Sequence, residues 1–215
     1  MKQIIDLTLA GLSETGNLRR LPADASASGR IDLSSNDYLG IASRPELQDE
    51  FLGSCDFSTM QMSASASRLL ARNQSAFGLL EETLASHYGR DALAFNSGYH
   101  ANVGLVSAFA GTGAYILADK LVHASIIDGI KLSGLQFSRF RHNDYGHLDS
   151  LAKKATADGK KLIIIAESVY SMDGDCADID ALAEVKRRYP GSLLYIDEAH
   201  AVGVEGPAGL GLCKA

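Results

Sequence analysis

The chain has 215 residues, of which 46% are hydrophobic and 21% are charged, and its formal net charge is -6. This composition is typical of a globular protein and excludes a disordered chain. The acidic balance, without a basic tract, disfavours a nucleic-acid partner or an anionic membrane surface. The three cysteines, Cys55, Cys176 and Cys213, form no C-x-x-C pair and are typical of free thiols in a reducing compartment. The longest strongly apolar run, residues 162–166, is far too short to span a membrane, so we expect a cytoplasmic protein.

The N-terminal residues 1–11 are predicted to form an amphipathic helix rather than a signal peptide, because charged and aliphatic side chains are interspersed there. The segment 23–29, rich in alanine and serine, is predicted to be a flexible connection. We therefore expect an N-terminal helix with its connecting segment over residues 1–33 and a large domain over residues 34–215.

From residue 75 onward, helical and strand patterns alternate along the chain. Helices are predicted over residues 75–88, 99–110, 123–133, 147–157 and 179–189. Strands are predicted over residues 92–95, 114–118, 136–140, 162–166 and 193–196. Because these strands are continuously apolar, they are expected to be buried on both faces, as in a parallel sheet covered by helices. The alternation predicts an α/β fold.

Polar and ionisable side chains follow the predicted strands at their carboxyl ends, where α/β sheets place their chemistry. The turn Ser97-Gly98-Tyr99 opens a helix, and its free backbone N–H groups favour a phosphate site, although a plain strand-to-helix turn has the same pattern. By itself, a histidine such as His123 at a helix start is more often a helix cap or a packed ring than a catalytic group. Asp197 is typical of either a carboxylate aimed into a pocket or another helix cap.

Two further motifs are weak by themselves. Residues 197–200 spell D-E-A-H, as in the magnesium-binding box of helicases, but no phosphate-cradling G-x-x-x-x-G-K-[ST] precedes them. Residues 206–211 contain loosely spaced glycines that do not follow a strand and open a helix, so they do not form a dinucleotide fingerprint.

Taken together, six blocks in order resemble one family, the α-oxoamine synthases, a branch of the fold-type I enzymes that use pyridoxal 5'-phosphate (PLP). The blocks lie at residues 34–40 (SSNDYLG), 97–102 (SGYHAN), 119–129 (DKLVHASIIDG), 141–144 (RHND), 167–175 (ESVYSMDGD) and 197–203 (DEAHAVG). The resemblance covers nearly the whole chain. It implies the three-layer large domain of a PLP-dependent transferase with a mostly parallel central sheet, incomplete over these 215 residues.

The resemblance also implies roles for individual residues. Gly98 and Tyr99 would offer backbone N–H groups to the cofactor, and His123 would stack on its ring and help to handle the substrate. Asp197 would pair with the protonated ring nitrogen and make the ring a better electron sink. The remaining implied residues are His200 and Ser171 around the 3′-oxygen of the ring, and Asn36 and Arg19 at the substrate end.

The reaction of the family is a decarboxylating condensation of an amino acid with an acyl thioester. The S-S-N-D-Y-L-G block most resembles the biotin-pathway member, whose substrates would be L-alanine and a pimeloyl thioester carried by coenzyme A or an acyl carrier protein. Glycine C-acetyltransferase is the alternative within the family, followed by 5-aminolevulinate and sphingoid-base synthases. The complete enzyme is expected to be a homodimer.

The sequence departs from the family in two places. Serine and alanine replace the usual glycines in residues 62–70, so Ser65 and Ser67 are only weak candidates for cofactor contacts. The lysine that joins PLP in the family lies beyond the D-x-x-H block and is not in this chain, nor is the small C-terminal domain; Lys214 lies too early to replace that lysine. We therefore expect this polypeptide alone to be inactive. A non-catalytic partner of a full-length homologue is the alternative from another class.

Overall fold

The computed structural model describes residues 1–21, 33–56, 58, 63, 66–70 and 75–214. The chain divides into two units, Met1–Ser35 and Asn36–Ala215. The first unit contains α1 (Lys2–Glu14), none of whose residues is buried. This helix was predicted over residues 1–11 and ends three residues later. The predicted connection over residues 23–29 lies outside the described residues, and the domain boundary between residues 33 and 34 stays a prediction.

The second unit is built on a parallel sheet. Its strands are β1 (Tyr115–Asp119), β2 (Gln136–Phe140), β3 (Leu162–Glu167) and β4 (Leu193–Asp197). They lie in the order β2-β1-β3-β4, and every neighbouring pair is parallel. The inner strands β1 and β3 are almost wholly buried, whereas β2 and β4 at the edges are more exposed. The predicted parallel sheet is thus confirmed, with its most apolar strands in the middle.

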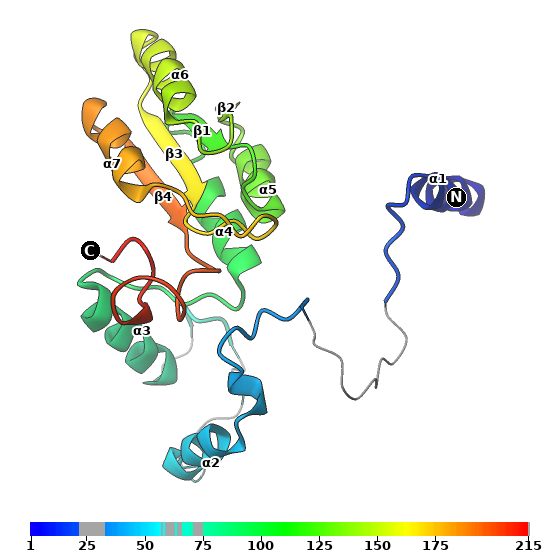
Figure 1. Ribbon diagram of the computed structural model, residues 1–215, viewed down its shortest axis with the longest axis vertical. Helices are drawn as coiled ribbons and strands as arrows, with labels where there is room; N and C mark the ends of the chain where they lie inside the picture. The colour runs from blue at the N-terminus through cyan, green and yellow to red at the C-terminus, as the bar shows by residue number, and fades with distance from the viewer. Residues whose placement is uncertain (22–32, 57, 59–62, 64–65, 71–74, 215) are drawn as a thin grey trace. The chain divides into compact units, whose positions relative to one another are not determined.

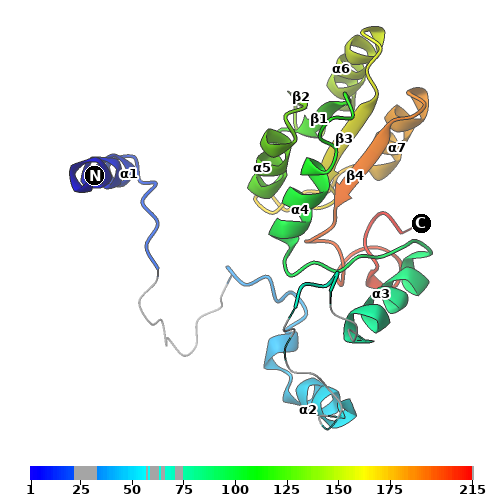
Figure 2. The ribbon, with the colours of Figure 1, turned by 180° about the vertical axis from the view of Figure 1, so that it is seen from behind.

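Helices cover both faces of this sheet (Figures 1 and 2). The helices are α4 (Gly98–Ser107) and α5 (Ala124–Ser133) on one face, and α6 (Tyr145–Ala157) and α7 (Ile179–Arg188) on the other. Successive side chains of a strand point to opposite faces. Ile116 therefore packs in the core under α4 and α5, and Leu117 packs in the core under α6 and α7. Burying each such aliphatic side chain stabilises the fold by about 2 kcal/mol.

Close packing of α4 against α5 depends on Gly129. A Cβ atom added there would lie 2.9 Å from Cβ of Val106 and 3.0 Å from the backbone oxygen of Asn102. These separations are shorter than van der Waals contact, so only glycine lets the two helices approach this closely. As a result Asn102, on α4, reaches the first turn of α5.

Side-chain caps explain where three of these helices begin. Ser97 caps α4, Asp144 caps α6 and Asp178 caps α7, each by accepting a hydrogen bond from a backbone N–H group in the first turn. Helix α6 begins at Tyr145 rather than at the predicted residue 147, because Asp144 already caps it. Residues Ile179–Arg188 and Gln136–Phe140 agree with prediction to within a residue.

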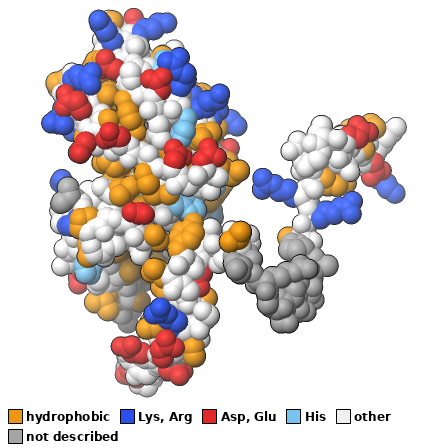
Figure 3. Space-filling view, in the orientation of Figure 1, with side chains coloured by type: hydrophobic (Ala, Val, Ile, Leu, Met, Phe, Trp, Pro, Cys, Tyr) orange, Lys and Arg blue, Asp and Glu red, His pale blue; other side chains and the backbone are white. Residues whose placement is uncertain are grey.

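The remaining elements lie before α4 and after β4. They are η1 (Ile41–Ser43), α2 (Pro45–Ser54), α3 (Ser75–Tyr88) and η2 (Pro207–Gly209). Helix α3 has the predicted bounds. On the face in Figure 3, acidic side chains gather over α2, whereas positive and negative side chains are interspersed over α6 and α7. Within the described ranges, no helix is both long and apolar enough to cross a membrane.

The strand predicted over residues 92–95 is wrong. The backbone of Ala94 is hydrogen-bonded to two side chains rather than to a neighbouring strand. Its N–H donates to Oε1 of Glu81 (2.7 Å), and its carbonyl accepts from Nη1 of Arg68 (3.3 Å). Leu93 remains 62% exposed. Residues 92–95 therefore form no strand. An apolar pattern favours a strand but does not by itself provide a neighbouring strand to pair with.

Candidate functional site

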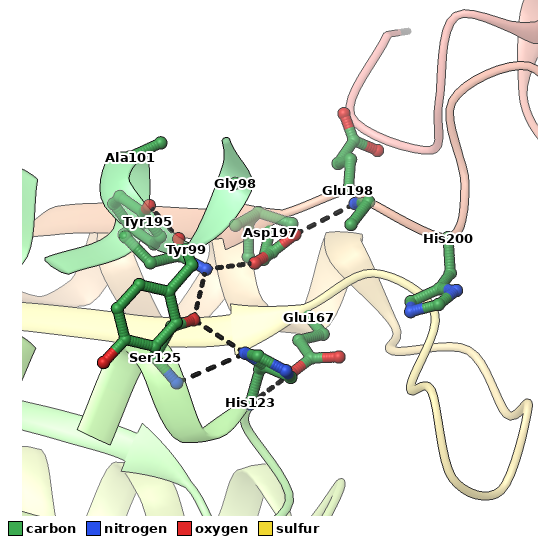
Figure 4. Close-up of a pocket in the computed structure, with 13 residues that line it drawn as sticks. Gly98, Tyr99, Ala101, His123, Ser125, Glu167, Tyr195, Asp197, Glu198 and His200 are labelled. Atoms are coloured by element: carbon green, nitrogen blue, oxygen red, sulfur yellow. Dashed lines mark hydrogen bonds between the residues drawn. The ribbon is translucent and has the colours of Figure 1, made fainter. Parts of the chain in front are cut away.

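A pocket of about 420 Å³ lies at the carboxyl ends of β3 and β4, beside the first turns of α4 and α5 (Figure 4). This volume falls within the range of roughly 300–1,000 Å³ typical of small-molecule sites. The residues that line it are Gly98, Tyr99, Ala101, Asn102, His123, Ser125, Glu167, Tyr195, Ile196, Asp197, Glu198, Ala199 and His200. The pocket therefore lies at the edge of the sheet where the sequence predicted functional residues.

Asp197 is held at the end of β4 by neutral donors. Asn102 donates from Nδ2 to Oδ2 of Asp197 (2.8 Å), and the backbone N–H of Ala199 donates to Oδ1 (2.9 Å). No ion pair between Asp197 and a lysine or arginine is found in the described part of the chain. A carboxylate held in this way keeps its negative charge available to a cationic group in the pocket.

Asn102 links three elements behind that carboxylate. Asn102 is buried. Its Nδ2 also donates to Oγ of Ser125 (3.0 Å), and its Oδ1 accepts from the hydroxyl of Tyr195 (2.5 Å). Burial and the charge of Asp197 raise the pKa of Tyr195 to about 12, so its hydroxyl stays a donor at neutral pH. Helices α4 and α5 and strand β4 thus hold Asp197 in one orientation.

His123 precedes α5 and faces the same pocket. Its Nδ1 lies 2.7 Å from Oγ of Ser125 and accepts from the backbone N–H of the same residue (3.2 Å). The imidazole therefore caps α5, as one of the two readings of the sequence expected, while its ring also lines the pocket. The cap fixes the ring without occupying Nε2.

Glu167 ends β3 and lies directly across from Asp197 in the parallel register. Its side chain accepts a hydrogen bond from the backbone N–H of His123. Burial raises the pKa of Glu167 to about 7, with a further contribution from the charge of Asp197, although hydrogen bonds from backbone N–H groups oppose this shift. Two carboxyl groups therefore share this edge of the pocket, and near neutral pH one of them carries a proton part of the time.

The start of α4 presents unoccupied donors to the pocket. The Ser97 side chain accepts from the backbone N–H of His100 (3.1 Å), but the N–H groups of Gly98 and Tyr99 donate to no residue in the described ranges. No atom lies within 4 Å of the position that a Cβ would take at Gly98. The first turn of α4 thus offers free N–H groups and space, as an anionic ligand requires.

His200 lines the pocket on another side, apart from the hydrogen-bonded group around Asp197 (Figure 4). Its Nδ1 lies 2.6 Å from the hydroxyl of Tyr38, which also donates to Oδ1 of Asn36 (3.3 Å). The structure therefore connects Asn36 to the pocket through Tyr38, a residue to which the sequence analysis assigned no role.

Four other residues that the sequence analysis named are not found in the pocket lining of the described structure. Ser171 is exposed in the loop after β3, and its backbone N–H favours the ionised form of Glu167. Arg19 belongs to the other unit of the chain. Ser65 lies outside the described residues, and Ser67 is exposed and does not line the pocket.

Sequence reasoning assigned no role to Asn102, Ser125, Glu167 or Tyr195. Glu167 was visible as a residue at the end of a strand, and Asn102 and Ser125 lay inside two of the six blocks, whereas Tyr195 lay within a predicted strand. No local pattern reveals that Asn102 and Tyr195, 93 residues apart, share a hydrogen bond.

A second group of polar side chains lies at the carboxyl ends of β1 and β2. It consists of Asp119, His142, Asn143 and Asp175, and we call it the closed cluster. Nδ1 of His142 lies 2.9 Å from Asp119, and Nε2 lies 2.8 Å from Asp175. Asn143 donates to both carboxylates, through its backbone N–H and its side-chain amide. Burial opposes a charge on His142, but the hydrogen bonds to the two carboxylates outweigh it and raise the pKa of the imidazole. In the part of the chain that the structure covers, no group of three or more His, Cys, Asp or Glu side chains is placed to hold a metal ion.

The family model "Aminotransferase class I and II" matches residues 28–212. A Pasteurella multocida protein named "Putative 8-amino-7-oxononanoate synthase" is 48% identical over 185 residues, which are 86% of this chain and 48% of that protein. A protein of the same name from Glaesserella parasuis is 46% identical over 96% of this chain and 56% of its own length. This chain spans about half the length of the curated relatives it matches.

Two solved structures are similar over most of this chain. Serine palmitoyltransferase from S. paucimobilis, as a lysine-to-alanine variant with a bound PLP–myriocin aldimine, superimposes with a TM-score of 0.78 at 26% identity, covering 98% of this chain and 57% of that one. The 8-amino-7-oxononanoate synthase from Francisella tularensis gives a TM-score of 0.68 at 30% identity, covering 86% of this chain and 50% of that one.

The chain thus belongs to the aminotransferase class I and II family, and its parallel sheet is part of the large domain of a fold-type I transferase. Within this family it belongs to the α-oxoamine synthase branch, as the six sequence blocks predicted. The members of this branch are PLP-dependent acyltransferases that act on small molecules.

Proposed function

We propose that residues 34–215 form the PLP-binding part of an enzyme that condenses L-alanine with a pimeloyl thioester, releasing CO2 and giving 8-amino-7-oxononanoate. The observation that carries this proposal is the single pocket that gathers Gly98, Tyr99, His123, Asp197 and His200. The names of the relatives at 46–48% identity support the choice of product. The thioester would be carried by coenzyme A or an acyl carrier protein, and the complete enzyme would be a homodimer.

The residues of the pocket fit PLP at both ends. The free N–H groups of Gly98 and Tyr99 suit a phosphate, and the carboxylate of Asp197, without a cation of its own in the described structure, suits a protonated pyridine nitrogen. When bound, PLP supplies an electron sink for the bonds at the α-carbon of an amino acid. The chain supplies charge, orientation and shape around that ring.

Each side chain has a defined task in this proposal. Asp197 would hold the proton on the ring nitrogen, because Asn102 and the N–H of Ala199 fix the orientation of its carboxylate. His123 would lie against the ring, with its imidazole fixed by Ser125. His200 and Ser171 would serve the 3′-oxygen.

The substrate end is assigned to Asn36 and Arg19. Asn36 is connected to His200 through the hydroxyl of Tyr38, which places it on the pocket side of its loop. Arg19 is a candidate clamp for a carboxylate, because a guanidinium group binds carboxylates through two parallel hydrogen bonds.

We also propose that the 215-residue chain does not turn over by itself. None of the residues that line the pocket is a lysine, and Lys214 is not among them. Without a lysine amine at the site, the chain lacks the base that takes the proton from the α-carbon in this family. Ligand binding does not require that amine.

Binding is tested with pyridoxine 5′-phosphate, which has no aldehyde and cannot react with surface lysines. Calorimetric titration of the 215-residue chain is expected to give saturable binding, and pyridoxine without the phosphate is expected to bind at least about tenfold more weakly. The absence of saturable binding would overturn the proposed cofactor site. Equal affinities would overturn the phosphate assignment to α4.

Substrates are tested by incubating the PLP-loaded chain with either L-alanine and pimeloyl-CoA or glycine and acetyl-CoA, followed by mass spectrometry. We expect no product from the 215-residue chain. Product from the first pair at an enzyme-like rate would refute the inactivity, and product from the second pair alone would replace the proposed activity with that of glycine C-acetyltransferase. Recovery of a full-length homologue in a pull-down from cells would instead favour a role as a non-catalytic partner.

A further inference from the structure

Glu167 is the most deeply buried carboxyl group that lines the pocket, and none of the roles above uses it. Its residue is only 3% exposed, and it lies across from Asp197 where β3 and β4 end. A buried carboxyl group beside a second carboxylate is costly unless its oxygens are hydrogen-bonded. The donors that meet this one therefore indicate what it does.

Those donors come from two different loops. The backbone N–H of His123, in the loop after β1, donates to Oε1 of Glu167. The backbone N–H of Ser171, in the loop after β3, favours the ionised form of the same side chain and lowers its pKa. One side chain thus ties together the two residues that the proposed site assigns to the face of the ring and to its 3′-oxygen.

We propose that Glu167 is a positioning residue of the cofactor site, whose buried carboxyl group sets the places of His123 and Ser171 together, by accepting a hydrogen bond from the backbone N–H of His123 and by attracting the backbone N–H of Ser171. This inference rests on the proposed function for its consequence, but the positioning itself is a property of the free chain. Glu167 acts through these two residues and is not a catalytic residue.

The geometry explains why both ends of His123 need to be held. Oγ of Ser125 lies 2.7 Å from Nδ1 and fixes the ring, and the carbonyl of His123 accepts from the N–H of Ile126, but these contacts tie His123 to α5 and not to the sheet. The bond from the backbone N–H to Glu167 fixes that loop to β3, which is a central strand of the sheet. A site built on a rigid strand holds its side chains more accurately than one built on loops alone.

The charge of Glu167 is sensitive to the occupant of the pocket. Burial and the nearby charges of Asp197 and Asp119 raise its pKa to about 7, while the backbone N–H groups of His123 and Ser171 favour the ionised form. A cationic ring paired with Asp197 would offset the charge that Glu167 faces, so ligand binding would favour ionised Glu167 and strengthen its attraction for the backbone N–H groups of His123 and Ser171. Positioning therefore tightens when the site is filled.

The test is amide hydrogen exchange, read by NMR at single residues in the free 215-residue chain. The variants are Glu167→Ala, which removes the acceptor, and Glu167→Gln, which keeps one acceptor oxygen without a charge. Glu184→Gln on the exposed surface of α7 is the matched control. In Glu167→Ala we expect the exchange of the His123 and Ser171 amides to accelerate about tenfold or more, with core amides such as Ile164 unchanged. Glu167→Gln is expected to restore the His123 amide, because it keeps an acceptor oxygen, and to leave the Ser171 amide accelerated, because it loses the charge.

A second measurement links this positioning to the ligand. The affinity for pyridoxine 5′-phosphate is expected to fall about tenfold in Glu167→Ala and less in Glu167→Gln. In Glu167→Gln, the affinity for pyridoxine 5′-phosphate is also expected to lose the pH dependence that is centred near pH 7. General destabilisation would change every amide and leave that pH profile in place.

The outcomes separate this inference from the proposed function. If His123 and Ser171 exchange in both Glu167 variants as they do in the control, Glu167 positions neither of them and the inference is wrong. If the ligand fails to bind even the unchanged chain, the proposed function fails, while the exchange rates still decide the role of Glu167. If Glu167→Ala unfolds, Glu167→Gln decides the inference. Accelerated exchange of the Ser171 amide with unchanged core amides supports it, and unchanged exchange of that amide overturns it.

Discussion

Two groups of polar side chains lie at the carboxyl edge of the same sheet, and they differ in how their carboxylates are satisfied. In the closed cluster, Asp119 is completely buried and meets a histidine of the chain itself, His142. In the pocket, Asp197 meets only the neutral donors Asn102 and the N–H of Ala199, with open space beside them. The position at a strand end is common to both.

A structural carboxylate and a ligand-binding carboxylate differ in the groups that meet their negative charge. A buried carboxylate needs a cation or several donors, and Asp119 meets the imidazole of His142, whose pKa is raised, and the backbone N–H groups of Leu121 and Asn143. Asp197 is oriented by its donors but has no cationic partner in the described structure. The first arrangement stabilises the fold, and the second leaves charge available for a ligand. The predictions below test this division.

The largest effect is expected in the closed cluster. Asp119→Ala should reduce the free energy of unfolding by about 4 kcal/mol, because it removes the buried partner of His142 and leaves the N–H groups of Leu121 and Asn143 without an acceptor. Urea denaturation measures the loss. Asp158→Ala, at an exposed position after α6, is the control and should change stability by less than about 0.5 kcal/mol. A small loss in Asp119→Ala would show that the cluster does not support the fold.

The second effect concerns pH and the pocket. The pKa of Glu167 is raised from 4.5 to about 7, so between these values the folded chain binds more protons at this site than the unfolded chain does. Stability contributed by this group should therefore fall as the pH rises through this window, by about 3 kcal/mol in total. In Glu167→Gln this slope should disappear, whereas Glu184→Gln should keep it. Parallel curves of unfolding free energy against pH for the Glu167 variant and the unchanged chain would contradict the assignment.

The third effect is on binding. Asp197→Asn keeps the shape of the side chain but removes its charge, so the affinity for pyridoxine 5′-phosphate should fall about thirtyfold, equivalent to about 2 kcal/mol. Calorimetry measures the dissociation constant. Asp175→Asn makes the same change in the closed cluster, and we expect it to leave the affinity within about twofold. If the two variants bound the ligand equally, the distinction between the two groups would collapse.

The smallest effect separates the cap of α4 from its donors. Ser97→Ala removes the oxygen that accepts from the N–H of His100 and should cost about 1 kcal/mol of stability. The N–H groups of Gly98 and Tyr99 remain, so ligand affinity should change little. Thermal unfolding and calorimetry on the same sample test both statements, and a loss of affinity without a loss of stability would assign the Ser97 hydroxyl to the ligand instead.

Much of the fold follows from local pattern. Residues 75–88 and 136–140 were predicted with the bounds that the structure shows, because hydrophobic spacing and turn residues are local properties of the chain. The run 92–95 has the same apolar character but no strand beside it, since pairing depends on residues elsewhere. Part of the site was also predictable from local pattern, because the carboxyl ends of parallel strands meet at one edge of the sheet. The pocket at that edge is lined by Gly98, Tyr99, His123, Asp197 and His200.

The sequence by itself thus determined the class of fold, the family and the edge of the sheet where polar residues gather. Only the tertiary structure decided which of those residues act together. It joined Tyr38 to His200 across 162 residues, placed Asn102 behind Asp197, and gave Glu167 its raised pKa. The physical reason is that periodicity belongs to neighbouring residues in the chain, whereas desolvation and electrostatic interaction are sums over whatever the fold brings within a few ångströms.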